Sequence, residues 1–245
     1  MRRLFAAGAA LAAILAGAPD AGAVQPYVMF EAGVVSRDVV EENDSIVGYQ
    51  FDGTASSTRV LATVGLDFNN IVTVYAQGGA ADLGIDEFNG FDSSFEGAYG
   101  GGVRLNLLLS QNPYGLRLFV DGSTLRTTAE DTVQAQIGSV WRSVEEEIEW
   151  NEYTILMGAG SRYGPYGPYG GIRLSWLDAT DRLRAAPAAG LPAGFKLDAD
   201  LKEQDNFGMF FGTDIFLDRS GKTSLNFEVA LIDQYSFRAA IRRAF

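Results

Sequence analysis

The final stretch of the chain constrains its fold more than any other feature. From Tyr235 to Phe245, apolar side chains alternate with polar or basic ones, and Arg243 is the exception on the apolar side. Successive side chains of a β-strand point to opposite faces, so this period of two predicts a strand with one apolar and one hydrated face. A terminal aromatic ring fits a membrane interface. An edge strand of a soluble β-protein would show the same alternation. Distinguishing it from a membrane strand requires the pattern of the rest of the chain.

The same alternation recurs in nine earlier segments, which brings the expected number of strands to ten. The connections between them alternate between long and short, and a two-residue hairpin at 233–234 precedes the last strand. A barrel with long loops at one end and short turns at the other requires this order, whereas a soluble sandwich does not. The expected earlier strands are 27–36, 58–68, 71–80, 95–108, 116–125, 147–162, 169–177, 206–217 and 223–232.

These features resemble the small bacterial outer-membrane β-barrels of the OmpA-like and OmpW-like group. The resemblance implies an all-β fold: a closed antiparallel up-and-down transmembrane β-barrel of about ten strands, with eight as the alternative. It also implies contact with outer-membrane lipid and lipopolysaccharide, and with the barrel-assembly machinery during insertion. In that group the last strand carries the assembly signal, which corresponds here to Tyr235, Phe237, Ile241 and Phe245. Arg243 departs from the pattern and must reach the headgroups.

The N-terminus is typical of a targeting segment. Arg2 and Arg3 precede an apolar run over 4–18, and Ala21-Gly22-Ala23 forms a small-x-small cleavage site. We expect residues 1–23 to be a cleaved signal peptide and 24–245 to be the barrel, exported to the outer membrane of a Gram-negative bacterium. The alternative is an uncleaved anchor helix, for which the apolar run is short.

The polar faces of the predicted strands carry five carboxylates and five arginines. Charges in a narrow lumen must pair or stay hydrated, so this balance predicts an ion-pair network. Side chains fill barrels of about eight strands, whereas 16–18 strands leave a channel. Two interpretations stay open: a plugged structural lumen, or a narrow pore or ligand pocket. The ten residues are Glu31, Asp67, Arg104, Arg117, Asp121, Arg173, Asp214, Glu228, Arg238 and Arg242.

A dense acidic cluster lies just before and within the sixth predicted strand. It allows two interpretations: a solvated loop face, or carboxylates that hold Ca²⁺ or bridge divalent cations among lipopolysaccharide phosphates. The spacing matches no EF-hand loop. The cluster consists of Glu145, Glu146, Glu147, Glu149 and Glu152.

Composition narrows the range of functions. The chain has neither Cys nor His, which excludes thiolate chemistry and removes the usual general base and the commonest metal ligand. We therefore expect no catalysis, no cofactor and no metal site, although barrel proteases and acyl-transfer enzymes share the expected fold. The net charge of −12 argues against nucleic-acid binding.

Two non-enzymatic functions remain. The first is a structural or envelope role, or surface interaction through the long loops, whose partners the sequence does not identify. The alternative is a narrow pore, or a transporter of small or apolar solutes, in the outer membrane.

Overall fold

The computed structural model describes residues 24–42, 50–86, 91–108, 115–137, 140–184 and 196–245. All of its strands belong to one antiparallel sheet. No helix among these residues is long and apolar enough to span a membrane. The strands are β1 (Val24–Glu42), β2 (Gln50–Phe68), β3 (Val72–Ala81), β4 (Gly84–Asp86), β5 (Phe91–Asp92), β6 (Glu96–Leu108), β7 (Arg117–Ile137), β8 (Val140–Gly160), β9 (Tyr166–Arg184), β10 (Lys196–Glu203), β11 (Phe207–Phe216), β12 (Thr223–Leu231) and β13 (Tyr235–Ala244).

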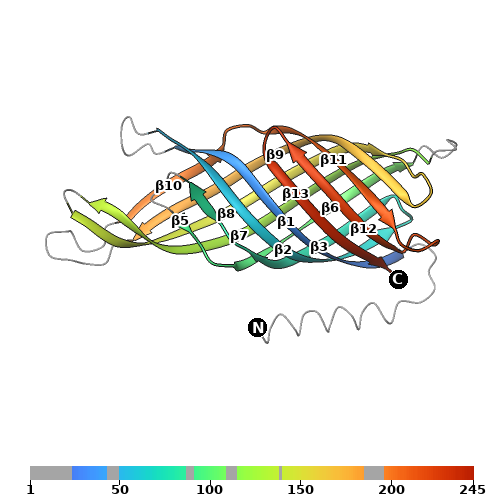
Figure 1. Ribbon diagram of the computed structural model, residues 1–245, viewed down its shortest axis with the longest axis horizontal. Coiled ribbons are helices and arrows are strands. Elements are labelled where there is room, and N and C mark those ends of the chain that lie inside the picture. Colours follow the sequence, from blue (N-terminus) through green and yellow to red (C-terminus); the bar gives the residue numbers. More distant parts are fainter. Residues whose placement is uncertain (1–23, 43–49, 87–90, 109–114, 138–139, 185–195) are drawn as a thin grey trace.

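The sheet closes on itself because β1 pairs with both β2 and β13. The closed ring runs β1-β2-β3-β6-β7-β8-β9-β11-β12-β13 and returns to β1, so ten strands form the barrel wall. Figure 1 shows the strands tilted along a long cylinder. The predicted fold class and strand number are confirmed.

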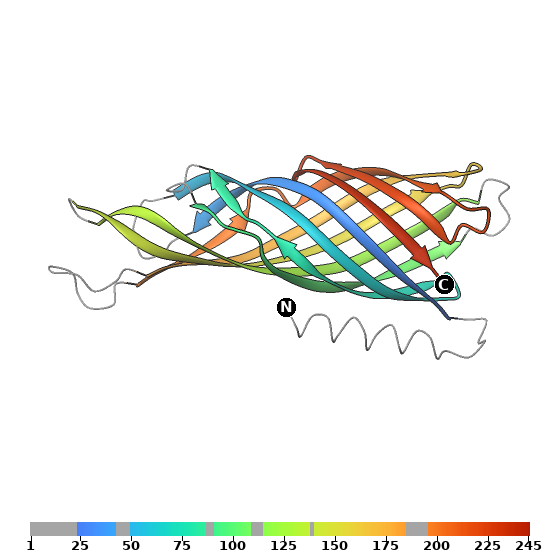
Figure 2. The same cartoon turned by 60° about the horizontal axis from the view of Figure 1, so that its bottom comes forward.

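The two ends of the cylinder differ. Short connections gather with Val24 and Phe245 at one end, which we call the turn end (Figure 1). At the other end, several strands continue well beyond the β12–β13 hairpin, most visibly β7 and β8 (Figure 2). There β10 pairs with β9 on one side and with β1 on the other. This strand closes the wall above the short hairpin, and we call the part beyond it the extension.

The prediction of long loops at this end is partly wrong, because much of the length assigned to loops forms strands. The segment 127–146 lies largely in the β7–β8 hairpin, which pairs from Arg117 with Gly160 to Ile137 with Val140. The segment 178–205 contains the end of β9 and all of β10. All five glutamates of the acidic cluster therefore lie on strand β8, including Glu145 and Glu146, which were expected just before the strand. The physical reason is a change of face: apolar residues point outward near the turn end and inward in the extension.

Apolar side chains cover the outside of the ring near the turn end. Phe30 is 61% exposed, Tyr99 60% and Leu107 60%, values that exclude packing in an interior. A surface of this size and character needs an apolar environment, which lipid provides around a closed barrel. We call this surface the belt. Its members include Phe30, Val34, Val60, Leu66, Val74, Tyr99, Val103, Leu105, Leu107, Leu118, Val120, Tyr153, Met157, Ile172, Trp176, Phe207, Met209, Phe211, Val229, Leu231, Phe237 and Ile241.

Glycines inside the ring make room for three tyrosine rings. Tyr27 lies over Gly65, and a Cβ added there would clash with the ring. Tyr75 covers Gly102, and Tyr169 covers Gly212, in the same way. These contacts fix where the phenol hydroxyls sit in the lumen.

Candidate functional site: the barrel lumen

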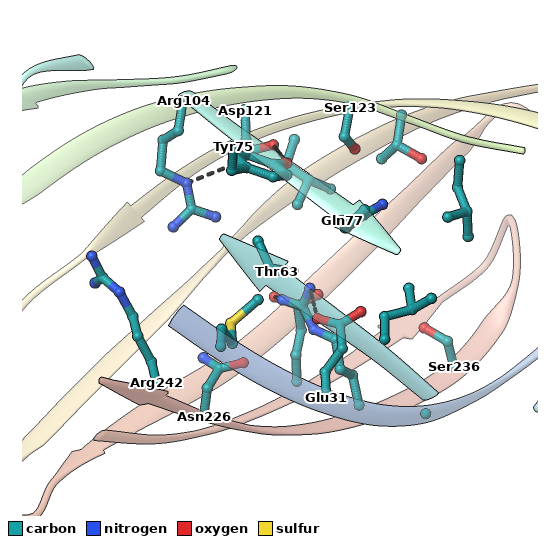
Figure 3. A pocket seen from close by; sticks show the side chains of 18 of the residues that line it. Glu31, Thr63, Tyr75, Gln77, Arg104, Asp121, Ser123, Asn226, Ser236 and Arg242 are labelled. Atoms are coloured by element: carbon teal, nitrogen blue, oxygen red, sulfur yellow. Dashed lines mark hydrogen bonds and ion pairs between the residues drawn. The ribbon is translucent and has the colours of Figure 1, made fainter. Parts of the chain in front are cut away.

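The lumen contains a polar cavity of about 250 Å³, shown in Figure 3. Inward-facing side chains from around the ring line it, as the period of two requires. All ten charged residues selected from the sequence are among those that line the cavity: Glu31, Asp67, Arg104, Arg117, Asp121, Arg173, Asp214, Glu228, Arg238 and Arg242.

Arg104 and Asp121 form one ion pair across adjacent strands. The Nε of Arg104 lies 2.7 Å from an Asp121 oxygen, and the Tyr75 hydroxyl donates to the other oxygen at 2.7 Å. The same guanidinium lies over the Phe119 ring, 5.0 Å from its centroid. The carboxylate is thus fixed by two donors and is 4% exposed.

Arg238 lies between two carboxylates. Its guanidinium nitrogens are 3.0 Å from Glu228 and 3.5 Å from Glu31. The Tyr169 hydroxyl donates to Glu228 at 3.0 Å and accepts a hydrogen bond from the Asn226 amide at 2.7 Å. This group forms a connected network on the β12–β13 side of the cavity.

A third pair, Arg117 with Asp214, lies at the turn end. The two side chains approach to 3.2 Å, and Asn226 donates to the second Asp214 oxygen at 3.1 Å. Asp67 has no arginine partner among the described residues. It accepts from the Asn70 amide N–H at 2.7 Å and from the Thr73 hydroxyl at 3.5 Å.

A second group of charges crosses the lumen at the end of the cavity that faces the extension. Glu152 is its centre: Arg59 binds both carboxylate oxygens, at 2.6 and 2.7 Å, and Arg37 lies 2.9 Å away. The indole N–H of Trp150 also donates to Glu152, at 3.1 Å. We call this group the charge layer; its ionised members are Arg37, Arg59, Arg173, Glu152, Glu203 and Asp233.

The other side of the charge layer is built from β10 and the turn of the β12–β13 hairpin. Arg37 pairs with Glu203 at 3.0 Å, and Arg173 with Asp233 at 3.2 Å. The Ser175 hydroxyl lies 3.1 Å from Glu203 and 2.9 Å from Asp233, which links the two carboxylates. Three arginines therefore meet three acids, as buried charges require.

The hairpin turn reaches into the lumen to complete this layer. Asp233 and Gln234 are 4% and 2% exposed, and Gln234 accepts a hydrogen bond from Arg37 at 2.6 Å. Ile232, just before them, has φ of 88°, which is rare and strained for a β-branched residue. The network holds this backbone in place.

Burial in the charge layer changes the pKa of the Glu203 carboxyl. Glu203 is the last residue of β10, which lies in the extension and not in the belt. Desolvation raises the pKa of Glu203 above its ordinary value, although Arg37 and the Ser175 hydroxyl oppose the rise.

Above the charge layer, the interior of the extension is mainly apolar, and the side chains of Glu146 and Asp181 are also buried there. Its apolar side chains form one cluster in which no member is more than 6% exposed. We call it the apolar seal. It consists of Val39, Ala55, Leu83, Ile85, Phe91, Ala129, Val133, Val144, Ile148, Trp150, Leu177, Ala179 and Leu201.

The acidic cluster on β8 divides between the two faces. Glu146 and Glu152 are buried, whereas Glu147 and Glu149 point outward and pair with Arg182. Arg126 and Arg184 extend this outer ladder. Within the described ranges, no three potential ligands gather closely enough to hold a metal ion.

The residues of the predicted assembly signal all point outward. Tyr235 is 69% exposed and Phe245 57%, and Phe237 and Ile241 are also exposed. Arg243 points outward beside Asp218, at 3.5 Å, in the turn between β11 and β12. Recognition of this strand by an assembly machinery stays a prediction.

Sequence reasoning missed most of the charge layer. Arg37, Glu203 and Asp233 fell in segments assigned to loops or to a turn, and Arg59 was placed on a polar face but not counted among the lumen charges. Glu152 was assigned to the acidic cluster. Glu152 lies two and four residues before Thr154 and Leu156, which both line the cavity, so it shares their face of the strand. That spacing would have placed its side chain in the lumen.

No family model and no curated protein matches the chain. Solved structures do. The outer membrane protease OmpT from Escherichia coli matches with a TM-score of 0.54 and 11% identity, covering 93% of this chain and 97% of that one. The translocator domain of autotransporter NalP from Neisseria meningitidis matches with a TM-score of 0.46 and 11% identity, covering 100% and 95%.

At these identities the likeness concerns the fold alone. Together with the closed ring and the belt, it defines the class: the chain has the fold of a small bacterial outer-membrane β-barrel. In this class the short turns and both termini lie on the periplasmic side, so we expect the extension to lie outside the cell.

Proposed function

We propose that the protein is a non-enzymatic outer-membrane barrel with a structural or surface-interaction role, and that its lumen does not conduct solutes. The observation that carries this proposal is the pair of layers that cross the lumen. A solute that enters from outside would meet the apolar seal first and the charge layer second. The first consists of apolar side chains, beside which the carboxylates of Glu146 and Asp181 are buried, and the second has its charges already paired.

The extension supports a role at the cell surface. Its outward faces carry charges in a fixed arrangement on paired strands, such as the ladder of Glu147 and Glu149 with Arg182. A rigid surface of this kind loses little conformational freedom when a partner binds. The belt provides the contact with outer-membrane lipid and lipopolysaccharide, and the final strand the contact with the barrel-assembly machinery.

The hydrogen bonding of three lumen carboxylates supports a non-enzymatic function. Asp121, Asp214 and Glu228 each bind an arginine and a further donor, so none is available as a general base. The chain also has no His to share a proton with them. Residues 1–23 act in this proposal as a cleaved export signal; they lie outside the described residues.

Ion conductance tests the proposal. Purified protein, shown to be folded by its faster gel mobility before boiling, is inserted into a planar bilayer beside a porin as positive control. We expect no channel steps. Reproducible steps that change in Arg173→Ala or Arg238→Ala would contradict the proposal and favour the narrow pore or solute transporter.

A further inference from the structure

Arg242 is the exception among the arginines that line the cavity. In the described part of the chain, Arg59, Arg104, Arg117, Arg173 and Arg238 each form an ion pair, whereas Arg242 forms none. Its contact is with the Tyr27 ring, 4.3 Å from the guanidinium carbon to the centroid. Its Nε is buried without a hydrogen-bond acceptor, as is that of Arg238, but Arg238 has two carboxylate partners and Arg242 has none among the described residues.

An arginine in this state has hydrogen-bond donors without acceptors. A guanidinium carries five N–H donors and stays charged at any pH a protein experiences. Burying a donor without an acceptor costs free energy, and native proteins rarely leave one in that state. Asp67 does not supply the acceptor in the structure: its carboxylate accepts from the Asn70 backbone N–H and the Thr73 hydroxyl, and no hydrogen bond or ion pair joins it to Arg242.

The position of Arg242 allows a ligand to reach it. The cavity extends to the turn end, because Asp67, two residues before the Asn69-Asn70 turn, and Arg117, the first residue of β7, both line it. Arg242 lies near the end of β13, at the same end of the barrel. A small molecule that enters at the turn end would reach Arg242 without crossing the charge layer or the apolar seal.

A second guanidinium faces Arg242 from the opposite wall. Figure 3 shows Arg104 extending from β6 toward Arg242 on β13. Arg104 binds Asp121 through Nε, which leaves the terminal nitrogens of its fork directed into the cavity. Two forks that converge across a gap match the geometry of a phosphate or a carboxylate.

We propose that Arg242, with Arg104 opposite, forms a binding site for a small oxyanion, a molecule with one phosphate or carboxylate group, that enters from the periplasm. The cavity of about 250 Å³ is smaller than the 300–1,000 Å³ typical of drug-sized ligands, which limits the ligand to a few heavy atoms beyond the anionic group. The site does not depend on whether the lumen conducts.

Calorimetric titration of the full barrel in non-ionic detergent tests the proposal, with inorganic phosphate and, separately, acetate as probes in a low-chloride buffer. Arg243→Gln is the matched control for Arg242→Gln. It removes the same charge one residue away, on the outer face. We expect saturable binding that weakens at least about tenfold in Arg242→Gln, the loss of one charge-assisted interaction, and stays unchanged in Arg243→Gln.

Two further results refine the outcome. Arg242→Lys keeps the charge but not the fork, so binding intermediate between wild type and Arg242→Gln supports the site. Binding of phosphate but not acetate also supports it and narrows the ligand class. The proposal is overturned if the wild type binds neither probe, or if both glutamine variants lose binding equally while heat-modifiable gel mobility shows that each is folded.

Discussion

The part of the barrel within the belt and the extension are built from the same strands with opposite polarity. On β8, Tyr153 and Met157 face lipid near the turn end, while Thr154 and Glu152 face the lumen. Further along the same strand, Glu147 and Glu149 point outward, and Ile148 and Trp150 are buried inside. The strand does not break, but its two faces exchange character.

This comparison shows that the surroundings decide which face is apolar. Where lipid surrounds the barrel, the apolar side chains point out and the polar ones share the lumen. Where water surrounds it, the barrel packs like an ordinary soluble protein around an apolar centre. The charge layer lies where the two arrangements meet, and it pairs the polar groups that neither environment covers.

The largest expected effect tests the charge layer itself. Glu152→Ala leaves the buried Arg37 and Arg59 without their shared carboxylate and should cost about 3–5 kcal/mol of unfolding free energy. Glu149→Ala, on the outer face of the same strand, breaks half-exposed pairs with Arg126 and Arg182 and should cost about 0–1 kcal/mol. Urea unfolding in lipid vesicles measures both, and equal losses would refute the distinction between the faces.

Next in size is the effect of a cavity in the extension. Ile148→Ala removes a fully buried side chain of the apolar seal and should destabilise by about 2–5 kcal/mol. Ile172→Ala makes the same change in the belt, where the side chain is 37% exposed and lipid fills the space, and should cost clearly less. A larger loss of unfolding free energy in Ile172→Ala than in Ile148→Ala would contradict this difference between the two regions.

A charge placed on the outer surface distinguishes the two regions directly. Leu105→Arg puts an arginine in the belt and should cost about 2–4 kcal/mol if it lies near the bilayer midplane. Thr128→Arg, outward-facing on β7 in the extension, should change stability by no more than about 0.5 kcal/mol. Comparable costs in vesicle refolding experiments would place the extension in lipid as well.

The smallest expected effect is a dependence on pH. Because burial raises the pKa of Glu203 above 4.5, the folded protein holds this proton more tightly than the unfolded chain does. The contribution of Glu203 to stability is then largest below pH 4.5 and falls as the pH rises through the folded pKa. The unfolding free energy of wild type relative to Glu203→Gln should therefore decrease from pH 4 to pH 7; a flat or rising difference would contradict the assignment.

The belt could be predicted from the sequence, and the extension could not. A period of two with one apolar face identifies strands wherever the outer surface meets lipid, as it does for Phe237 and Ile241. At Asn151 and Glu152 the apolar positions of β8 shift by one residue, which ends the pattern and resembles the start of a loop. The same alternation predicted which side chains point into the lumen. It could not predict their ion-pair partners, because those depend on which strands lie opposite one another.

The burial of Asp233 shows the same limit. The sequence placed a tight turn there, and a turn between short strands predicts exposure. In the structure Asp233 is buried because β10 passes above the hairpin and pairs with β1. These two strands lie far apart in the sequence. No local pattern contains that information.

The side of the membrane from which the cavity can be reached tests the central claim most directly. The chain has no cysteine, so single ones can be introduced at Ser123 in the cavity, Ser220 in a turn and Ser94 in the extension. Proteoliposomes are treated from outside with a small, charged, membrane-impermeant thiol reagent. We expect the labelled fraction at position 123 to equal that at position 220, because the seal blocks access from the extension. Complete labelling at position 123, equal to the sum of the fractions at positions 220 and 94, would show an open lumen and contradict the account.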